Sequence, residues 1–177
     1  FQSPLDHGDD DGRSRHVRIC KIDAANAVVV GQYVYPLDRP GSFERDRKDG
    51  DVERRDLKVC ELVCIGQDRL LVLERVSRSA KVYRIELAGP GASAAHLDVA
   101  TRPTLEQMSA RDLAAAGVQV LDKTLLLSTD EADEIVADLE GMAALTAHEL
   151  VLVYDNDFGT EGAETCFFRV TFDEPVL

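Results

Sequence analysis

The sequence contains no tryptophan, only 6% aromatic residues, and no apolar run as long as a membrane-spanning helix. Because such a helix needs about 18 or more consecutive apolar residues, we expect no membrane insertion. Basic residues are also scarce: 20 lysines and arginines stand against 33 aspartates and glutamates, which gives a net charge of −13. Nucleic-acid binding requires a basic surface that neutralises phosphates, so this charge argues against a nucleic-acid partner and favours cations.

The first residues lack the basic and apolar stretches of a secretion signal, and the chain starts with Phe1 instead of methionine. We therefore expect that an upstream segment has been removed or is not included. The length of 177 residues fits a single domain, residues 1–177. A chain of this size buries roughly 70% of its unfolded surface, so a substantial core is expected.

Cysteine is sparse as well, with four residues: Cys20, Cys60, Cys64 and Cys166. Cys60 and Cys64 have the spacing of a metal-binding pair, but four residues of strand separate them by about 13 Å, too far to chelate one ion. The favoured interpretation is buried free thiols that behave as small hydrophobic residues. A disulfide is the alternative, and four cysteines allow three pairings.

Apolar and polar residues alternate in several short runs, which is the pattern of half-buried strands. Six strands are predicted on this basis, at residues 16–22, 27–35, 57–65, 69–74, 81–87 and 118–127. The first two are expected to form a hairpin, and the next three an antiparallel meander. Residues 36–55 are polar and contain Pro40 and Gly41, so a loop is expected there.

Two short helices are predicted between this meander and a later one. Thr104 and Gln107 have the spacing of an N-terminal capping box, and Gly117 is placed to end the first helix. Ser128 and Glu131 have the same capping spacing and predict the start of a second helix. The other face of this second helix is acidic and is expected to be solvated.

An internal repeat is the most informative feature of the sequence. Residues 61–85 have the pattern strand, turn, strand, loop, strand, and residues 140–170 repeat it, with an offset of 79 residues from Glu61 to Glu140 and 85 at the third strand. Repeated antiparallel meanders are typical of a β-propeller, and a closed ring needs about four blades or more. We therefore predict an all-β fold of propeller-like, four-stranded antiparallel blades in a partial ring, with one or two short helices inserted between blades.

Several ordered segments resemble a known family. They are residues 1–5, 32–37, 71–75, 81–85, 139–143, 155–159 and 167–170. In this order they are similar to the phytase-like family described as esterase-like activity of phytase. The resemblance implies a bacterial, secreted or periplasmic β-propeller with metal-dependent phosphoesterase or esterase chemistry on a small phosphorylated or ester substrate. It matches the chain to the C-terminal half of longer members, so we expect the chain to be part of a larger propeller.

The candidate metal ligands are Glu140, Asp155, Asn156 and Asp157, with Glu61 at the related position of the preceding repeat. Glu140 starts a predicted strand and the other three follow the neighbouring strand, so a meander would bring their oxygen atoms to one end of a blade. Ca²⁺ prefers six to eight oxygen ligands, which an acidic chain supplies, so calcium is the expected cofactor. The alternative is that Asp155 and Asn156 form side-chain hydrogen bonds to the backbone of a turn.

Glu74 and Arg75 are the candidate catalytic residues. In the functional interpretation, Arg75 binds a phosphate or carboxylate through two hydrogen bonds, and Glu74 holds an ion or orients Arg75. The alternative is a rim ion pair that contributes less than about 1 kcal/mol. Nucleophilic and zinc chemistry are poorly supported, because Ser93 lacks the glycine pattern of a nucleophile elbow and the histidines lack metal-binding spacing. The acidic residues 6–12 are expected to form a solvated loop.

The leading prediction is therefore a phytase-like, calcium-dependent hydrolase of phosphate esters. The alternative is a non-catalytic β-propeller module that binds a partner or ligand. Unpaired strand edges at the ends of a partial ring also predict self-association.

Overall fold

The computed structural model describes residues 2–5, 14–88, 96, 98, 100–135, 138–162 and 164–177, without the side chains of Asp157 and Glu161. The strands are β1 (His16–Asp23), β2 (Val28–Pro36), β3 (Lys58–Gly66), β4 (Arg69–Arg75), β5 (Ala80–Glu86), β6 (Lys123–Ser128), β7 (Leu139–Thr146), β8 (Glu149–Tyr154) and β9 (Cys166–Thr171). The helices are α1 (Glu44–Asp49) and α2 (Ala110–Ala115), with 3-10 turns η2 (Pro40–Ser42), η3 (Arg54–Asp56), η5 (Thr129–Glu131) and η6 (Asp157–Gly162).

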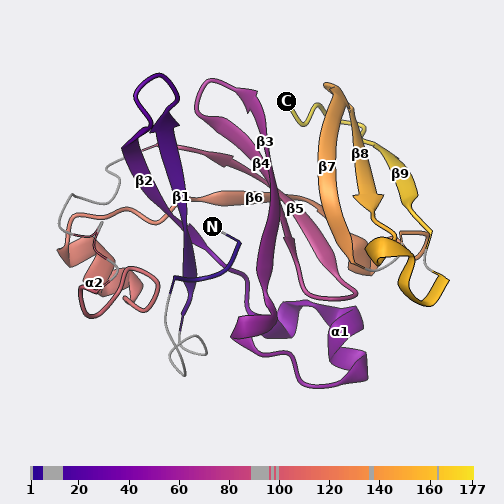
Figure 1. The fold of residues 1–177 in the computed structure, drawn as a ribbon, viewed down its shortest axis with the longest axis horizontal. Helices are drawn as coiled ribbons and strands as arrows, with labels where there is room; N and C mark the ends of the chain where they lie inside the picture. Colours follow the sequence, from indigo (N-terminus) through magenta and orange to yellow (C-terminus); the bar gives the residue numbers. More distant parts are fainter. Residues whose placement is uncertain are drawn as a thin grey trace.

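The strands form three antiparallel sheets in chain order: β1–β2, β3–β4–β5–β6 and β7–β8–β9. Figure 1 shows these sheets side by side, with the tight turns of the first strand pairs at one end and α1 at the other. The predicted all-β fold with short helices between propeller-like blades is therefore confirmed. In the described part of the chain only the central sheet has four strands.

Most of the core lies in the two spaces between the three sheets, and a third, smaller cluster packs Val34 of β2 against Leu113 of α2 and their neighbours. Val72 of β4 belongs to the hydrophobic cluster shared with the first sheet, whereas Leu71 and Leu73 belong to the cluster shared with the third. Successive residues of a strand point to opposite faces, so one apolar run supplies both clusters. All three side chains are fully buried. This explains why β4 is continuously apolar, as expected for a strand covered on both sides.

The internal repeat is exact in its cross-strand register. Val59 pairs with Glu74 in β3–β4, and Leu139 pairs with Tyr154 in β7–β8. Each paired residue of β7–β8 lies 80 positions after its counterpart in β3–β4. The predicted offset of 79 at the first strand is therefore wrong by one residue, while the offset of 85 at the third strand is confirmed. Because a shift of one residue in a strand reverses the face of each side chain, this correction changes which residues are equivalent.

The first predicted helix is shorter than expected and starts later. Ser109 is the N-cap of α2: its hydroxyl accepts a hydrogen bond from the N–H of Asp112, whose carboxylate accepts one from the N–H of Ser109. Thr104 therefore does not start the helix. Gly117 follows α2 with a positive φ of 71°, a conformation that favours glycine, so the predicted stop is confirmed.

The second predicted helix is wrong. Ser128 and Glu131 frame only the 3-10 turn η5, and Leu139 belongs to β7. Asp130 is not simply solvated, because its carboxylate accepts hydrogen bonds from the N–H groups of Glu44 and Arg45 at 3.1 and 3.0 Å. These are the first N–H groups of α1, which lies in the segment predicted to be a loop. The negative charge of Asp130 thus stabilises a helix start that is distant in sequence.

All four cysteines are free in the structure, so the interpretation as thiols is confirmed. Their predicted burial is only partly correct, because Cys64 is exposed and the other three are half-buried. None of the described helices has the length and apolar composition that crossing a membrane requires.

Candidate functional site

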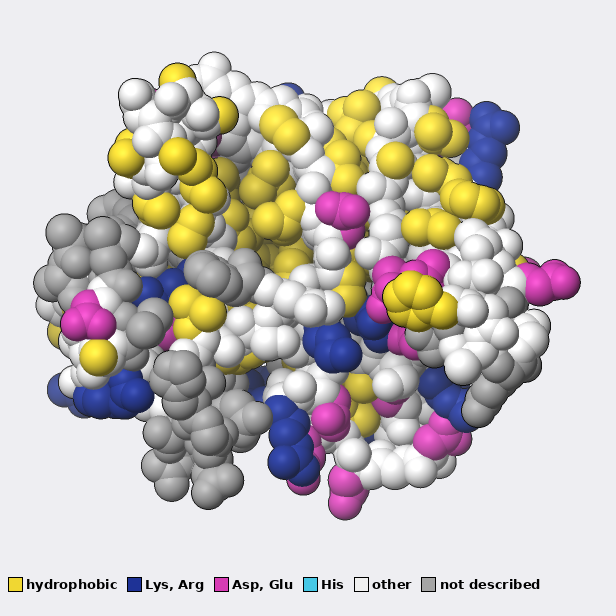
Figure 2. Space-filling model, in the orientation of Figure 1, with side chains coloured by type: hydrophobic (Ala, Val, Ile, Leu, Met, Phe, Trp, Pro, Cys, Tyr) yellow, Lys and Arg dark blue, Asp and Glu magenta, His cyan; other side chains and the backbone are white. Residues whose placement is uncertain are grey.

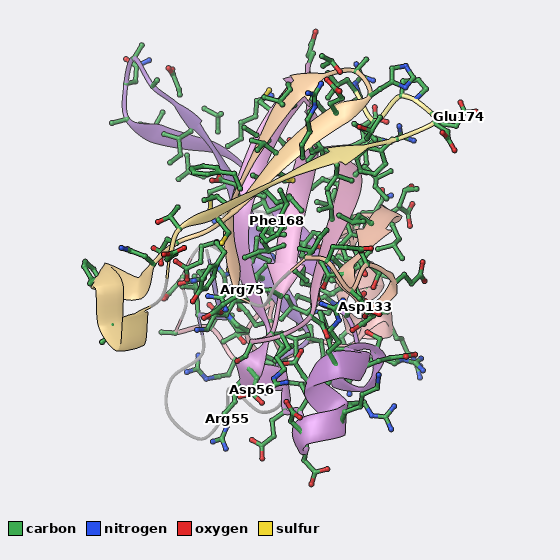
Figure 3. The ribbon with its side chains drawn as sticks, turned by 90° about the vertical axis from the view of Figure 1, so that its right-hand side faces the viewer. Arg55, Asp56, Arg75, Asp133, Phe168 and Glu174 are labelled. Carbon is green, nitrogen blue, oxygen red and sulfur yellow. The ribbon has the colours of Figure 1, made fainter. Side chains whose placement is uncertain are left out.

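Charged side chains gather at the end of the sheets where β2, β4 and β8 stop and β3, β5 and β7 begin. α1 and the connections from β2 to β3, from β6 to β7 and from β8 to β9 lie at this end (Figure 1). In Figure 3, Arg75 lies at this end of the sheets, with Arg55 and Asp56 further out beside α1. We name it the connection end, and the candidate site is built from its residues.

Arg75, the last residue of β4, links the second and third sheets. Its Nε donates a hydrogen bond to Cys60 Sγ at 3.0 Å, and one terminal nitrogen donates to Glu140 Oε1 at 2.7 Å. The other terminal nitrogen donates to the Asp138 carboxylate and to the carbonyl of Val76. Burial disfavours the charged guanidinium, but Cys60, Asp138 and Glu140 outweigh it and raise the pKa of Arg75. The structure thus brings Arg75 and Glu140 into direct contact.

Glu74 faces the other way, towards the first sheet, and is fully buried. Its carboxylate accepts hydrogen bonds from the Tyr35 hydroxyl at 2.8 Å, the Asp38 N–H at 2.6 Å and the Lys123 ammonium at 2.7 Å. Burial raises the pKa of Glu74, and the charge of Lys123 offsets part of that effect. The structure therefore does not place Glu74 where it orients Arg75, because strand alternation separates the two side chains.

Asp38 completes a lysine–carboxylate network, defined as Asp38, Glu74, Lys81 and Lys123. The two oxygens of Asp38 accept from Lys81 at 2.7 Å and Lys123 at 2.8 Å, and the Tyr83 hydroxyl donates to Asp38 at 2.6 Å. Burial alone would raise the pKa of Asp38, but these three donors together lower it. The network contains two cations and two anions in mutual contact, so its charges are balanced and it fastens the first sheet to the second.

Sequence analysis missed the residues that complete this network, Asp38, Lys81 and Lys123. The available signal was a lysine inside an apolar strand: Lys81 lies between Ala80 and Val82 and is only 6% exposed. A buried lysine requires a carboxylate partner, so this position could have indicated an ion pair. Which carboxylate supplies it depends on how the sheets pack.

Among the side chains that the structure describes, the predicted metal ligands do not form a group that could hold an ion. Glu61 is half-buried and its carboxylate accepts from the N–H of the next residue, while Asp155 and Asn156 are exposed. The side chain of Asp157 lies outside the described residues. Within the described ranges, no three histidine, cysteine, aspartate or glutamate side chains are arranged to hold a metal ion. Since calcium needs six to eight oxygen ligands, the described residues do not fit a preformed calcium site.

A charged cleft of about 400 Å³ opens beside α1 at the connection end. It is lined by Asp46, Asp49, Gly50, Asp51, Val52, Arg55, Asp56, Lys58, Val76, Ser77 and Arg78. The Asp46 carboxylate accepts from the N–H groups of residues 77, 78 and 79 at 3.0, 2.9 and 2.7 Å, which fixes one wall. Ser77 also joins the cleft to the Arg75 contacts, because its carbonyl accepts from the N–H of Asp138 at 2.8 Å.

Several charged side chains of the cleft are already paired with protein groups. Arg78 forms an ion pair with Asp49 at 2.5 Å, and Arg55 with Glu53 at 2.7 Å. Within the described part of the chain, the side chains of Lys58 and Asp51 have no such partner. The cleft therefore presents one uncommitted cation and one uncommitted carboxylate. Sequence analysis missed both residues, because they lie in or beside a dense run of mixed charge.

Comparison with known proteins gives one informative result. The model of the Phytase-like family, described as esterase-like activity of phytase, matches residues 1–158. The expected placement of the chain in the C-terminal half of the family is wrong. Neither the search of curated proteins nor the search of solved structures gives a significant match. Since the family model covers most of the chain, the chain belongs to the Phytase-like family, described as esterase-like activity of phytase.

Proposed function

We propose that this esterase-like domain hydrolyses small phosphate esters, and that the substrate binds in the charged cleft. Family membership supports a phytase-like or esterase-like hydrolase. The observation that carries the location is the pair of uncommitted charges, Lys58 and Asp51, that line one open cleft. An ammonium group binds phosphate oxygens as a point charge, and an exposed carboxylate can accept a proton from an attacking water.

In this proposal Arg75 is a positioning residue. Its donors contact Cys60, Asp138 and Glu140, so binding of a substrate phosphate would first have to displace those acceptors. Arg75 does not line the cleft, but Asp138, which it holds, bonds to the carbonyl of Ser77 in the cleft wall. Arg75 would therefore act on the substrate through the shape of this wall.

Calcium remains a proposal that rests on the family resemblance, and we assign no step of the reaction to it. Calorimetric titration of the chain with calcium tests it, together with melting in calcium and in chelator. A ligand that binds only the native state raises the melting temperature. If calorimetry detects no heat of binding and calcium does not raise the melting temperature, calcium binding is contradicted.

The test of the hydrolase proposal uses p-nitrophenyl phosphate and p-nitrophenyl acetate as probes, with and without calcium. We expect turnover of the phosphate ester and at least a tenfold loss of kcat/KM in both Lys58→Met and Asp51→Asn, because each removes one charge from the cleft. Lys48→Met is the matched control, since Lys48 lies on α1 and does not line this cleft. Failure of the native chain to hydrolyse either probe, or equal activity in all variants, would overturn the proposal.

A non-catalytic binding module is the second candidate. Two observations favour it: all three nitrogens of the Arg75 guanidinium already donate to protein groups, and the described residues contain no metal-binding group. This candidate predicts that inorganic phosphate binds in the cleft, that Lys58→Met weakens the binding, and that no ester is turned over.

The proposals of export and self-association rest on the family resemblance and on the unpaired strand edges, respectively. Cell fractionation of the native host tests the first, and a periplasmic or extracellular location is expected. Sedimentation at several concentrations tests the second.

A further inference from the structure

A second cleft, of about 480 Å³, lies between the first two sheets beside the turn that joins β3 to β4. It is lined by Ile19, Cys20, Lys21, Leu62, Cys64, Gly66, Gln67, Asp68, Leu70 and Leu87. Figure 2 shows hydrophobic side chains gathered in a hollow between the β1–β2 hairpin and the central sheet. We name it the apolar cleft.

The walls of the apolar cleft are formed by the hydrophobic cluster that lies between the first and second sheets. Ile19 is a buried member of that cluster, and Leu70 and Leu87 pack against it. Leu62 is 38% exposed, so part of this apolar surface is open to solvent. The volume lies within the range of about 300–1,000 Å³ that is typical of small-molecule sites, which are also mostly apolar with few polar groups.

The polar side chains of the apolar cleft lie together near the β3–β4 turn. The Lys21 ammonium donates to the Asp68 carboxylate, and Gln67 is the neighbouring turn residue. The two charges of the lining cancel each other, and the chain as a whole carries a net charge of −13. An anion would be repelled by the protein and would have to compete with Asp68 for Lys21. The lining therefore matches an uncharged apolar molecule with one hydrogen-bonding group.

We propose that the apolar cleft is a binding site for such a molecule, with its apolar body against Ile19, Leu62 and Leu70 and its polar group near Lys21 and Asp68. The site is separate from the charged cleft, because the two share no lining residue. It does not depend on the hydrolase proposal.

Two thiols from different sheets allow binding in the apolar cleft to be measured. Cys20 of β1 and Cys64 of β3 both line the apolar cleft, and Cys64 is exposed. A bound molecule would cover them, whereas Cys60 and Cys166 lie elsewhere and serve as internal references. Modification by N-ethylmaleimide, followed by mass spectrometry of the peptides, measures each thiol separately.

The first experiment compares two fluorescent probes on the native chain: N-phenyl-1-naphthylamine, which is uncharged, and its sulfonated relative 8-anilinonaphthalene-1-sulfonate. We expect saturable binding of the uncharged probe, at least tenfold tighter than that of the anion, with slower modification of Cys64 and unchanged modification of Cys166. Absence of saturable binding, equal binding of the anion, or equal protection of all thiols would overturn the proposal.

The second experiment uses a matched pair of variants. Leu62→Lys places a charge in the apolar cleft, whereas Leu125→Lys places one on β6, at a residue that is 49% exposed and outside the cleft. Both changes affect exposed side chains, so both variants should fold. We expect at least a tenfold loss of affinity for the uncharged probe in Leu62→Lys alone. Equal affinity in the two variants, or a dimer in which a second copy fills the cleft and excludes the probe, would contradict a small-molecule site.

Discussion

Cys60 and Glu140 occupy equivalent bulges in two different sheets, and both accept a hydrogen bond from Arg75. The register skips Cys60 between Val59 and Glu61 of β3, and it skips Glu140 between Leu139 and Gly141 of β7. A bulge re-aims the side chain of the extra residue and is frequent beside functional sites. Here two copies of one bulge converge on a single guanidinium, which joins the second sheet to the third.

Replacement of Arg75 tests this link. Arg75→Met removes donors to three side chains, but the carboxylates of Asp138 and Glu140 are about half exposed and can form hydrogen bonds with water instead. We therefore expect a loss of about 1–2 kcal/mol in the free energy of unfolding, less than for a fully buried charged hydrogen bond. Urea denaturation measures it, with Arg55→Met, at a 59% exposed side chain, as the control. Equal stability of Arg75→Met and the native chain would mean that the link contributes nothing.

Gly141 is required because β7 and β8 approach closely beside the bulge. A Cβ at this position would lie 2.6 Å from Cγ1 of Val153. Gly141→Ala should therefore destabilise the chain by about 1–3 kcal/mol, the usual cost of overpacking. Gly50→Ala is the control, because its backbone is extended and no atom lies within 4 Å of the new methyl group. A second change, Val153→Ala, should recover part of the loss, and no recovery would rule out the steric explanation.

Lys123 contacts both carboxylates of the lysine–carboxylate network. Its ammonium contacts Asp38 and Glu74 at 2.8 and 2.7 Å, and it lies 4.0 Å from the centre of the Tyr83 ring. Lys123→Met leaves the buried Glu74 without its cation, so we expect a loss of about 3–5 kcal/mol at neutral pH. The double variant with Glu74→Gln should be more stable than Lys123→Met alone in urea denaturation. If the double variant is less stable, the buried charge is not the cause.

His16 predicts a pH dependence of stability. Its side chain is 7% exposed, and among the described residues its Nδ1 has no hydrogen-bond partner. Burial lowers the pKa of His16 below its ordinary value of 6.5. Between the two values the unfolded chain binds a proton that the folded chain does not, so the free energy of unfolding falls as the pH drops below 6.5.

The variant His16→Asn separates this effect from the other titrating groups. Urea denaturation at pH 7, 6 and 5 should show a smaller loss of stability on acidification in His16→Asn than in the native chain. His148→Asn is the control, because it replaces a histidine whose side chain is exposed. The same slope in all three proteins would contradict the assignment to His16.

The hairpin and the two meanders follow from local features of the sequence. Alternation of apolar and polar residues predicted the first hairpin and both meanders within a few residues, since each strand buries one or both of its faces. Gly117 was recognised as a helix end because its backbone conformation is costly for other residues. The resemblance to the Phytase-like family was also visible in the order of short segments, and the family match confirms it.

Other features depend on how the sheets pack against one another. The one-residue bulges that make Cys60 and Glu140 equivalent cannot be seen in the sequence, because residues 62–65 and 141–145 are continuously apolar and contain no alternation that would fix the register. The prediction of the second helix was wrong because the Ser128 side chain makes no capping hydrogen bond, and Asp130, which was expected to be solvated, instead binds the start of α1.

Glu74 and Arg75 show the same division most clearly. From the sequence alone they are adjacent opposite charges. Because they are neighbours in a strand, their side chains must point to opposite faces of the sheet, and their positions say nothing more about their partners. Their partners, Lys123 for Glu74 and Glu140 for Arg75, come from segments 49 and 65 residues away. Local sequence determines which face a strand residue occupies, but only the packing of whole sheets decides which charge lies opposite, because burial forces each ion to find a counter-ion wherever the fold supplies one.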